Sequence, residues 1–275
     1  MSKAKFAYAI WPWGLETKEQ MIQALKDVGE IGYEAFESVE SAVDLFDGDI
    51  GEFKRIIDDH GVKPASFYFW LKGDEKDDVG RVRNKIEFLA ANDVQRMSVQ
   101  GPRWSGSPAT QEELDLTLRI IEQIGDIAKD HGVVPCVHPH HGTWIMHENE
   151  IDFIMQRVNP EYVAFNPDTA HLAAGKCDPV EIVERYKVRV KFTHLKDLKM
   201  DTALDEDAKG EQGFAIYENF RELGEGDVDM EGVFRILKSV GYDGYLLPEL
   251  DKSRFSNKES ARINMEYLKS HWKEV

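Results

Sequence analysis

The chain has 275 residues, of which 42% are hydrophobic and 31% are charged, a balance typical of a globular protein large enough for one sizeable α/β domain. Its formal net charge of −17 argues against a nucleic-acid partner, because an acidic surface repels phosphate backbones. No apolar run approaches the roughly 20 residues that span a bilayer, so we expect no membrane partner either.

Short apolar segments alternate with stretches of helical spacing at intervals of roughly thirty residues. In chain order, we predict β-strands over residues 6–10, 34–37, 64–70, 97–100, 133–138, 163–168, 190–194 and 245–249. Parallel neighbouring strands need a long crossover connection, usually a helix. The alternation therefore predicts a parallel sheet covered by helices.

Several helix ends can be recognised between these strands. Thr17 with Gln20, and Thr110 with Glu113, have the spacing of a capping box ahead of an apolar helical stretch. An N-cap is also expected at Asp178 before Pro179. Helix C-caps are expected at Gly61, Gly132 and Gly241.

Eight strand–helix units in a chain of this length predict a single (β/α)₈ barrel domain over residues 1–275. An open doubly wound sheet is the alternative, but it would usually carry a glycine-rich loop after its first strand, where this chain has Pro12, Trp13 and Gly14. Residues 198–228 lack helical periodicity. A loop this long after the seventh strand is usually functional, so we expect a lid over the site.

The working residues of such barrels lie at the C-terminal ends of the strands. The last four predicted strands end at His138, Asp168, His194 and Glu249. Taken singly, each could be a helix cap or a loop hydrogen-bond partner. Together they form a set of imidazole and carboxylate ligands that suits one divalent ion, with Mn²⁺ first and Co²⁺, Mg²⁺, Fe²⁺ or Zn²⁺ as alternatives.

Other strand ends supply candidate ligand contacts. The second and fourth strands end at Glu37 and Gln100, and Trp13 and Trp104 follow the first and fourth. Aromatic walls at such positions often contact a ligand, although core packing or loop anchoring is an equal alternative for each tryptophan. We expect these four residues to contact substrate.

The cysteine content and the N-terminal segment indicate the cellular compartment to expect. Cys136 and Cys177 lack any metal-binding or redox spacing, so we expect no disulfide framework and a reducing, cytoplasmic environment. The apolar stretch near the N-terminus is interrupted by Pro12 and lacks a small-residue cleavage pattern, which favours a first strand over a signal peptide.

The second half of the chain resembles the xylose-isomerase-like superfamily of sugar isomerases, epimerases and dehydratases, and within it the inosose dehydratases. The matching segments are HPHHGT (138–143), DTAHL (168–172), HLKD (194–197), LGEG (223–226) and GYDG (241–244), the last leading to Glu249. Members of this superfamily commonly bind their metal with Glu, Asp, His and Glu. Here His138 replaces the first glutamate, and Met200 stands where an arginine is often found.

The resemblance implies a lyase that eliminates water from a cyclic polyhydroxy ketone, such as 2-keto-myo-inositol, through a metal-stabilised enolate. It implies metal binding by His138, Asp168, His194 and Glu249. His140 and His171 are then the expected acid and base, with Glu249 at the reacting centre, and Lys196 and Glu37 are polar contacts to substrate. Which group is the acid and which the base stays open.

Other functions remain open at this point. A metal-dependent isomerase or epimerase of a free sugar uses the same enolate chemistry, and eliminations from 3-keto sugars or 3-keto glycosides are related. The superfamily also includes metal-dependent DNA-repair endonucleases, which the acidic charge disfavours. A sugar-binding barrel without catalysis is a further alternative. The sequence leaves the oligomeric state open, including a homo-oligomer.

Overall fold

The computed structural model describes residues 4–103, 108–200 and 216–274. Its main sheet has eight parallel strands in the order β6-β5-β4-β3-β2-β1-β10-β7. The strands are β1 (Lys5–Ala9), β2 (Ala35–Val39), β3 (Lys63–Trp70), β4 (Arg96–Gln100), β5 (Val134–His138), β6 (Ala164–Phe165), β7 (Thr193–Leu195) and β10 (Tyr245–Pro248). All eight predicted strands are therefore present.

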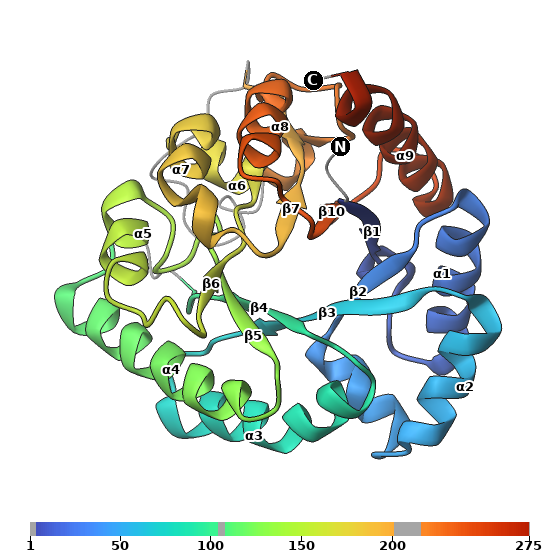
Figure 1. Cartoon of the computed structure of the whole chain (residues 1–275), viewed down its shortest axis with the longest axis horizontal. Coiled ribbons are helices and arrows are strands. Elements are labelled where there is room, and N and C mark those ends of the chain that lie inside the picture. Colours follow the sequence, from blue (N-terminus) through green and yellow to red (C-terminus); the bar gives the residue numbers. More distant parts are fainter. Residues whose placement is uncertain (1–3, 104–107, 201–215, 275) are drawn as a thin grey trace.

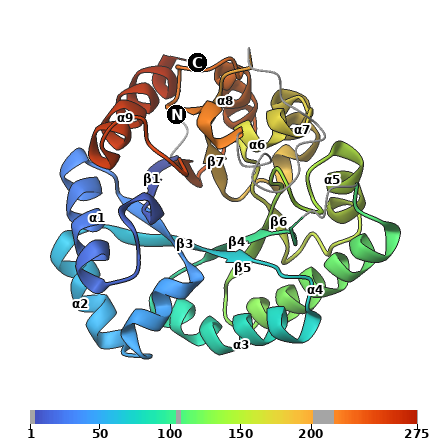
Figure 2. The same cartoon turned by 180° about the vertical axis from the view of Figure 1, so that it is seen from behind.

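The sheet closes into a barrel between β6 and β7. Two isolated parallel bridges, Phe165 with Val190 and Asp168 with His194, join these two ends of the strand order. Figures 1 and 2 show the helices as a ring outside the strands. This is the (β/α)₈ barrel that the sequence predicts, and it brings the carboxyl ends of all eight strands to one mouth.

The surrounding ring is made of helices that follow the strands in sequence. Its members are α1 (Lys18–Ile31), α2 (Ile50–His60), α3 (Glu75–Ala91), α4 (Gln111–Lys129), α5 (Glu148–Met155), α6 (Thr169–Ala174), α7 (Pro179–Tyr186), α8 (Met230–Ser239) and α9 (Asn257–Glu274). Short 3₁₀ helices are η1 (Trp11–Trp13), η2 (Glu40–Phe46) and η3 (Lys187–Arg189). Within the described ranges, no helix combines the length and apolar character needed to cross a membrane.

Local signals fix the helix ends. The capping boxes at Thr17 and Thr110 are both formed, and the Asp178 side chain caps α7 as predicted. Gly61 ends α2 in the left-handed conformation, with φ of 66°, which glycine adopts without steric cost. The other two predicted C-cap glycines, Gly132 and Gly241, also have positive φ but lie just beyond the caps of α4 and α8, which are Asp130 and Val240.

The predicted sixth and seventh strands are shorter in the structure. The regular part of β6 stops at Phe165, because Pro167 has no N–H to continue a ladder and Asp168 caps α6. Before β7, η3 occupies residues up to Arg189, and Val190 forms only an isolated bridge. The shortened strands still bring Asp168 beside His194.

Small residues fill the barrel beneath its mouth. A separate buried cluster contains Ala7, Ala9, Ala35, Ala65, Cys136, Ala164, Phe192 and Leu247. Because side chains alternate along a strand, Ala35 shares a face with Glu37, and Cys136 shares one with His138. These clustered residues mark the barrel interior and leave room above them for larger polar side chains.

The predicted long loop has structured ends. β8 (Asp197–Leu198) pairs antiparallel with β9 (Phe220–Arg221). The Asp197 carboxylate accepts hydrogen bonds from four backbone N–H groups, those of Leu198, Gly224, Gly226 and Val228. Residues 201–215, the centre of the predicted lid, lie outside the described residues, so the lid stays a prediction.

Candidate functional site

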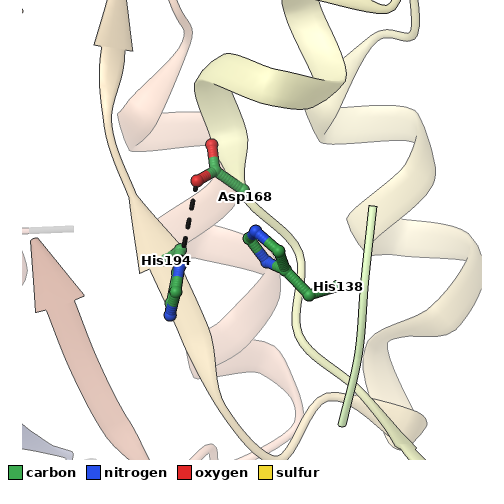
Figure 3. A group of neighbouring side chains, drawn as sticks. All are labelled: His138, Asp168 and His194. Atoms are coloured by element: carbon green, nitrogen blue, oxygen red, sulfur yellow. Dashed lines mark ion pairs between the residues drawn. The ribbon is translucent and has the colours of Figure 1, made fainter. Parts of the chain in front are cut away.

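Three side chains from consecutive strand ends converge at the barrel mouth. His138 ends β5, Asp168 precedes α6 and His194 lies in β7, and all three are buried. One potential ligand atom from each lies within 4.8 Å of the other two. Nδ1 of His194 is 3.9 Å from Oδ2 of Asp168, the contact that is dashed in Figure 3.

The converging atoms make no hydrogen bonds to other described residues, although the Lys196 ammonium lies 3.6 Å from Oδ2 of Asp168. Nδ1 of His138, Oδ2 of Asp168 and Nδ1 of His194 are all buried without a hydrogen bond. Burying unsatisfied polar atoms is costly, and native structures rarely leave three together. Two imidazole nitrogens and a carboxylate oxygen are typical ligands for a divalent transition metal. The donor set therefore fits the predicted metal ion.

Hydrogen bonds at their other polar atoms orient two of these donor side chains, His194 and Asp168. A Glu37 oxygen is 2.5 Å from Nε2 of His194, and the other Glu37 oxygen accepts hydrogen bonds from the hydroxyls of Ser66 and Ser98. With Glu37 accepting from Nε2–H, Nδ1 of His194 is left with its lone pair facing Asp168. Likewise Oδ1 of Asp168 accepts a hydrogen bond from the backbone N–H of His171. This leaves Oδ2 available to a metal ion between the three side chains.

Glu37 was expected to contact substrate. The structure places it in the barrel interior with no exposed surface. Both of its oxygens are bound to neighbouring side chains. A carboxylate held in this way is placed to orient the His194 imidazole, and Glu37 does not line the described cavity.

Glu249, the fourth predicted ligand, lies beside the three but is bound to a cation. It ion-pairs with the Lys196 ammonium, which also lies 2.9 Å from Asp251 and 3.6 Å from Asp168. An oxygen of Glu249 is 4.0 Å from Nδ1 of His194. Burial alone lowers the pKa of Lys196, but the three carboxylates outweigh it and raise that pKa above its usual range.

Of the two predicted acid–base histidines, only His140 lines the mouth cavity that the structure describes. Its ring packs against that of His171 with centroids 3.5 Å apart and a tilt of 31° between the ring planes. Burial, the largest effect, lowers the pKa of His140 to about 3, so its imidazole is neutral near pH 7. His171 lies behind it, with one ring nitrogen 3.3 Å from the His141 N–H and the other 3.2 Å from the Lys196 ammonium.

The mouth contains a cavity of about 320 Å³. Its lining combines the acidic and imidazole groups of the site with aromatic and aliphatic side chains. The lining residues are Trp11, Gly14, Leu15, Glu16, Val39, Ser41, Tyr68, Trp70, His138, His140, Glu249 and Asp251. The cavity therefore contains His138 and Glu249 of the predicted ligand set together with aromatic rings, and the Trp11 ring centroid lies 6.1 Å from that of His194.

Two predicted substrate contacts, Trp13 and Gln100, do not line the described cavity. Trp13 points its indole N–H at Asp27 of α1, at 2.9 Å, because the 3₁₀ turn of η1 separates it from Trp11, the tryptophan that lines the cavity. Gln100 is buried and accepts a hydrogen bond from the Tyr68 hydroxyl instead of lining the cavity. Trp104 lies outside the described residues.

Sequence reasoning missed several residues of the cavity, among them Tyr68, Trp70 and Asp251. Tyr68 and Trp70 lie two and four residues after Ser66 in β3, so they share a face with Ser66, which is bonded to Glu37. The period of two along a predicted strand could therefore have identified them. The Tyr68 ring centroid is 5.2 Å from that of His138. Asp251 lies two residues beyond Glu249, and the same alternation could have indicated that it faces the mouth.

Comparisons with known proteins agree with this architecture. The chain is 32% identical over 146 residues to an inosose dehydratase of Lacticaseibacillus casei, a match covering 52% of this chain and 49% of that protein. It is 29% identical over 184 residues to an inosose dehydratase of Clostridium tetani, covering 64% of this chain and 61% of that protein. The first match thus spans about half the length of its relative.

Solved structures share the fold at low sequence identity. The IolI protein, crystallised with a zinc atom, matches with a TM-score of 0.77 and 17% identity, covering 98% of this chain and 99% of that chain. The probable 3-DHS dehydratase AsbF of Bacillus anthracis matches with a TM-score of 0.75 and 13% identity, covering 96% of this chain and 98% of that chain. These two likenesses show the fold alone.

The model of one protein family matches almost the whole chain. The match, to the xylose isomerase-like TIM barrel, runs over residues 25–271 and so includes the strand ends that carry the converging donors. The chain therefore belongs to the xylose isomerase-like TIM-barrel family.

Proposed function

We propose that this protein is a divalent-metal-dependent lyase that eliminates water from a cyclic polyhydroxy ketone, with 2-keto-myo-inositol as the leading substrate. The observation that carries the proposal is the convergence of donor atoms without hydrogen bonds from His138, Asp168 and His194 beside the mouth cavity. Relatives at about 30% identity are named inosose dehydratases, and the IolI structure contains a zinc atom. Both support this choice of reaction and cofactor.

The metal would be held by His138, Asp168 and His194, with Glu249 as a further ligand once its carboxylate turns from Lys196. A bound divalent cation supplies Lewis-acid stabilisation of the negative charge that develops on the ketone oxygen when the neighbouring proton is removed. We propose Mn²⁺ as the first ion to test. Co²⁺, Mg²⁺, Fe²⁺ and Zn²⁺ are tested beside it, because oxygen and imidazole donors accept several divalent ions.

His140 is the proposed proton carrier. It lines the cavity, and burial lowers its pKa, so its imidazole is neutral near pH 7 and has an unprotonated ring nitrogen. The lowered pKa makes this nitrogen a weak base, so the first proton transfer depends on the acidity that a bound cation would give the proton next to the ketone. The imidazolium so formed can donate the same proton to the departing hydroxyl, which leaves as water. His171 acts through His140, because it packs against that ring and does not line the cavity.

Lys196, which was predicted to contact substrate, does not line the described cavity. Its ammonium is buried and faces Asp168, Glu249 and Asp251. We propose that it positions Glu249 and Asp251 at the cavity wall, where their oxygens can accept hydrogen bonds from substrate hydroxyls. The positive charge also offsets the repulsion among three carboxylates in a low-dielectric site.

The cavity favours an unphosphorylated substrate. Its described lining contains Glu16, Glu249 and Asp251 but no lysine or arginine. Phosphate groups are usually bound by arginine, lysine or helix N-termini. A neutral keto-polyol therefore suits the lining better than a sugar phosphate.

The proposed function can be tested by incubating the Mn²⁺-loaded protein with 2-keto-myo-inositol and following the products by mass spectrometry. We expect a product lighter by one water that does not form after chelation. Conversion to an isomer of equal mass would instead indicate a metal-dependent isomerase or epimerase. If the ketone is unchanged with each of Mn²⁺, Co²⁺, Mg²⁺, Fe²⁺ and Zn²⁺, this substrate is wrong.

A further inference from the structure

A second group of potential metal ligands lies beside the first. One ligand atom from each of Asp168, His171 and Glu249 lies within 4.8 Å of the other two, and all three side chains are buried. In the first group, Asp168 is joined by His138 and His194 instead. Because Asp168 belongs to both groups, they define two neighbouring cation positions that share one carboxylate.

The ammonium of Lys196 occupies the second position. Its Nζ lies 3.6 Å from Oδ2 of Asp168 and 3.2 Å from Nε2 of His171, and it forms a close ion pair with Glu249. Asp251 adds a carboxylate oxygen at 2.9 Å. Because an ammonium group only donates hydrogen bonds, these oxygen and nitrogen atoms present lone pairs to it, as they would to a metal ion.

The surrounding residues hold the ammonium at this point. Lys196 retains only 1% of its surface, and lysine is almost never buried to that extent unless it is paired. The Phe220 ring centroid lies 4.4 Å from the ammonium and adds a cation–π contact. The Thr169 hydroxyl accepts a hydrogen bond from the backbone N–H of Lys196 and donates one to its carbonyl oxygen. Both the backbone and the amine of this lysine are therefore fixed.

The two positions have the same donor chemistry but differ in what fills them. Each combines imidazole nitrogen with carboxylate oxygen, a set that several divalent ions accept. In the first position, Nδ1 of His138 and Nδ1 of His194 have no hydrogen bond, whereas in the second the chain supplies its own cation. Paired metal ions in enzymes lie about 3.5–4 Å apart. At such a spacing in a buried site, a divalent ion and an ammonium cannot share one position, because they repel each other strongly.

We propose that Lys196 takes the place of a second metal ion and so limits the site to one. Removal of its amine opens a second position for a divalent cation that prefers oxygen and imidazole ligands, such as Mn²⁺. That position is formed by three carboxylates and one imidazole, those of Asp168, Glu249, Asp251 and His171. The inference rests on the metal site of the proposed function but not on its reaction or its substrate.

The number of bound ions tests this inference without any turnover. At saturating Mn²⁺, titration calorimetry should give one ion per wild-type chain and two per chain of Lys196→Ala. Electron paramagnetic resonance provides a second readout, since two Mn²⁺ ions about 3.5–4 Å apart couple magnetically and a single ion does not. Lys199→Ala is the matched control, because it removes a partly exposed lysine that pairs with Asp227. It should bind one ion and give the uncoupled spectrum.

Further measurements assign the extra ion to the second position. His171 belongs to the second group and not to the first, so the double variant Lys196→Ala/His171→Phe should again bind one ion. His171→Phe alone should bind one ion with an affinity within a factor of a few of the wild type. Ethylammonium should displace the extra ion from Lys196→Ala, because it returns an ammonium group to the same position. Ethanol, which is neutral and of similar size, should not displace it.

The inference is overturned if the wild type binds two ions, if folded Lys196→Ala binds one, or if the extra ion remains in the double variant. Thermal unfolding identifies the variants that are folded. Lys196→Ser repeats the test if the alanine variant does not fold, because its hydroxyl can donate a hydrogen bond to a carboxylate.

Failure of the proposed function looks different. If the proposed reaction is wrong, the ion counts and the competition by ethylammonium remain, while 2-keto-myo-inositol is not converted. If the first metal position is wrong, the wild type binds no ion. Lys196→Ala should then bind one ion and the double variant none. The ion counts therefore separate a wrong second position from a wrong reaction or a wrong first position.

Discussion

Glu37 and His194, 157 residues apart in sequence, meet inside the barrel with a carboxylate oxygen 2.5 Å from Nε2. This contact determines which nitrogen of His194 is available to a metal, because the nitrogen that donates to Glu37 cannot also be a ligand. Nδ1 is left facing Asp168. Glu37 therefore belongs to the site although it does not reach the cavity.

Glu37→Gln should weaken divalent-metal binding by about 10–100-fold, the usual cost of removing a carboxylate behind a metal-binding histidine. The amide keeps the size of the side chain but can no longer hold the imidazole tautomer as a carboxylate does. Titration calorimetry with Mn²⁺ or Zn²⁺ measures the change. Glu16→Gln, at an exposed position on the cavity rim, is the matched control. If Glu37→Gln binds the metal as tightly as the control Glu16→Gln does, Glu37 does not have this orienting role.

Metal binding should stabilise the fold. At a free metal concentration 100 times the dissociation constant, the gain in unfolding free energy is about 2.7 kcal/mol, or roughly 5–10 °C in melting temperature for a domain of this size. Differential scanning fluorimetry with and without a chelator measures this shift. Its absence with all five candidate ions would exclude the metal centre.

Asp168→Asn should abolish that shift, because the amide removes the anionic donor. The chain supplies a close control in Asp178→Asn. Both aspartates cap helices, α6 and α7, and asparagine is a comparable N-cap. The control should therefore melt near the wild-type temperature and keep the full metal response.

His140→Ala should retain metal but lose turnover by about 10² or more, the scale of general acid–base contributions. Metal affinity should stay within a factor of a few, because the converging donors are on other residues. Product formation from 2-keto-myo-inositol, measured beside metal titration, separates the two effects. His131→Ala, an exposed histidine beyond α4, should change neither. An undiminished rate in His140→Ala would remove this residue from the mechanism.

The barrel was predictable because its signals are local. Apolar runs, the capping boxes at Thr17 and Thr110, and the glycine at the end of α2 all act within a few residues. The errors in strand bounds arose where one local signal gives way to another. The sixth strand was predicted through Asp168, but its ladder ends near Pro167, where backbone hydrogen bonding switches to the start of α6.

The candidate site was predictable to a similar extent. Strand-end positions identified His138, Asp168 and His194 as neighbours, because the carboxyl ends of parallel strands meet at one mouth. They could not indicate that Trp11 rather than Trp13 faces the cavity, since that depends on the turn of η1. Nor could they show Glu37 bonded to His194, because that contact depends on packing across the barrel interior.

Lys196→Met should destabilise the metal-free protein by about 3–5 kcal/mol, because it leaves buried carboxylates without their counter-charge. Added divalent metal should restore more stability to this variant than to the wild type, since Asp168 and Glu249 lose their competing partner. Urea unfolding with and without Mn²⁺ measures both. Lys199→Met, which affects an exposed pair with Asp227, should cost less than about 1 kcal/mol. A metal-free Lys196→Met protein as stable as the wild type would contradict this account.

Asp197→Asn should loosen the hairpin that follows β7. Each oxygen of the carboxylate accepts two hydrogen bonds from backbone N–H groups. Oδ1 accepts those of Leu198 and Val228, and Oδ2 accepts those of Gly224 and Gly226. An amide can accept at one end only, so two N–H groups lose their partner. Gly224 is exposed and Gly226 is partly exposed, so water can replace part of the lost bonding. At a net cost of about 0.5–1.5 kcal/mol for each hydrogen bond, the unfolding free energy should fall by roughly 1–3 kcal/mol.

Hydrogen exchange shows whether that loss is local. The amides of Gly224 and Gly226 should exchange faster in Asp197→Asn while those of the barrel strands change less. Asp227→Asn, at an exposed neighbouring position, should leave both amides protected. Gly226→Ala offers an independent check, because a Cβ there would lie 2.2 Å from the Asp197 carboxylate and should open the same segment. Unchanged exchange in both variants would show that Asp197 does not hold the hairpin in place.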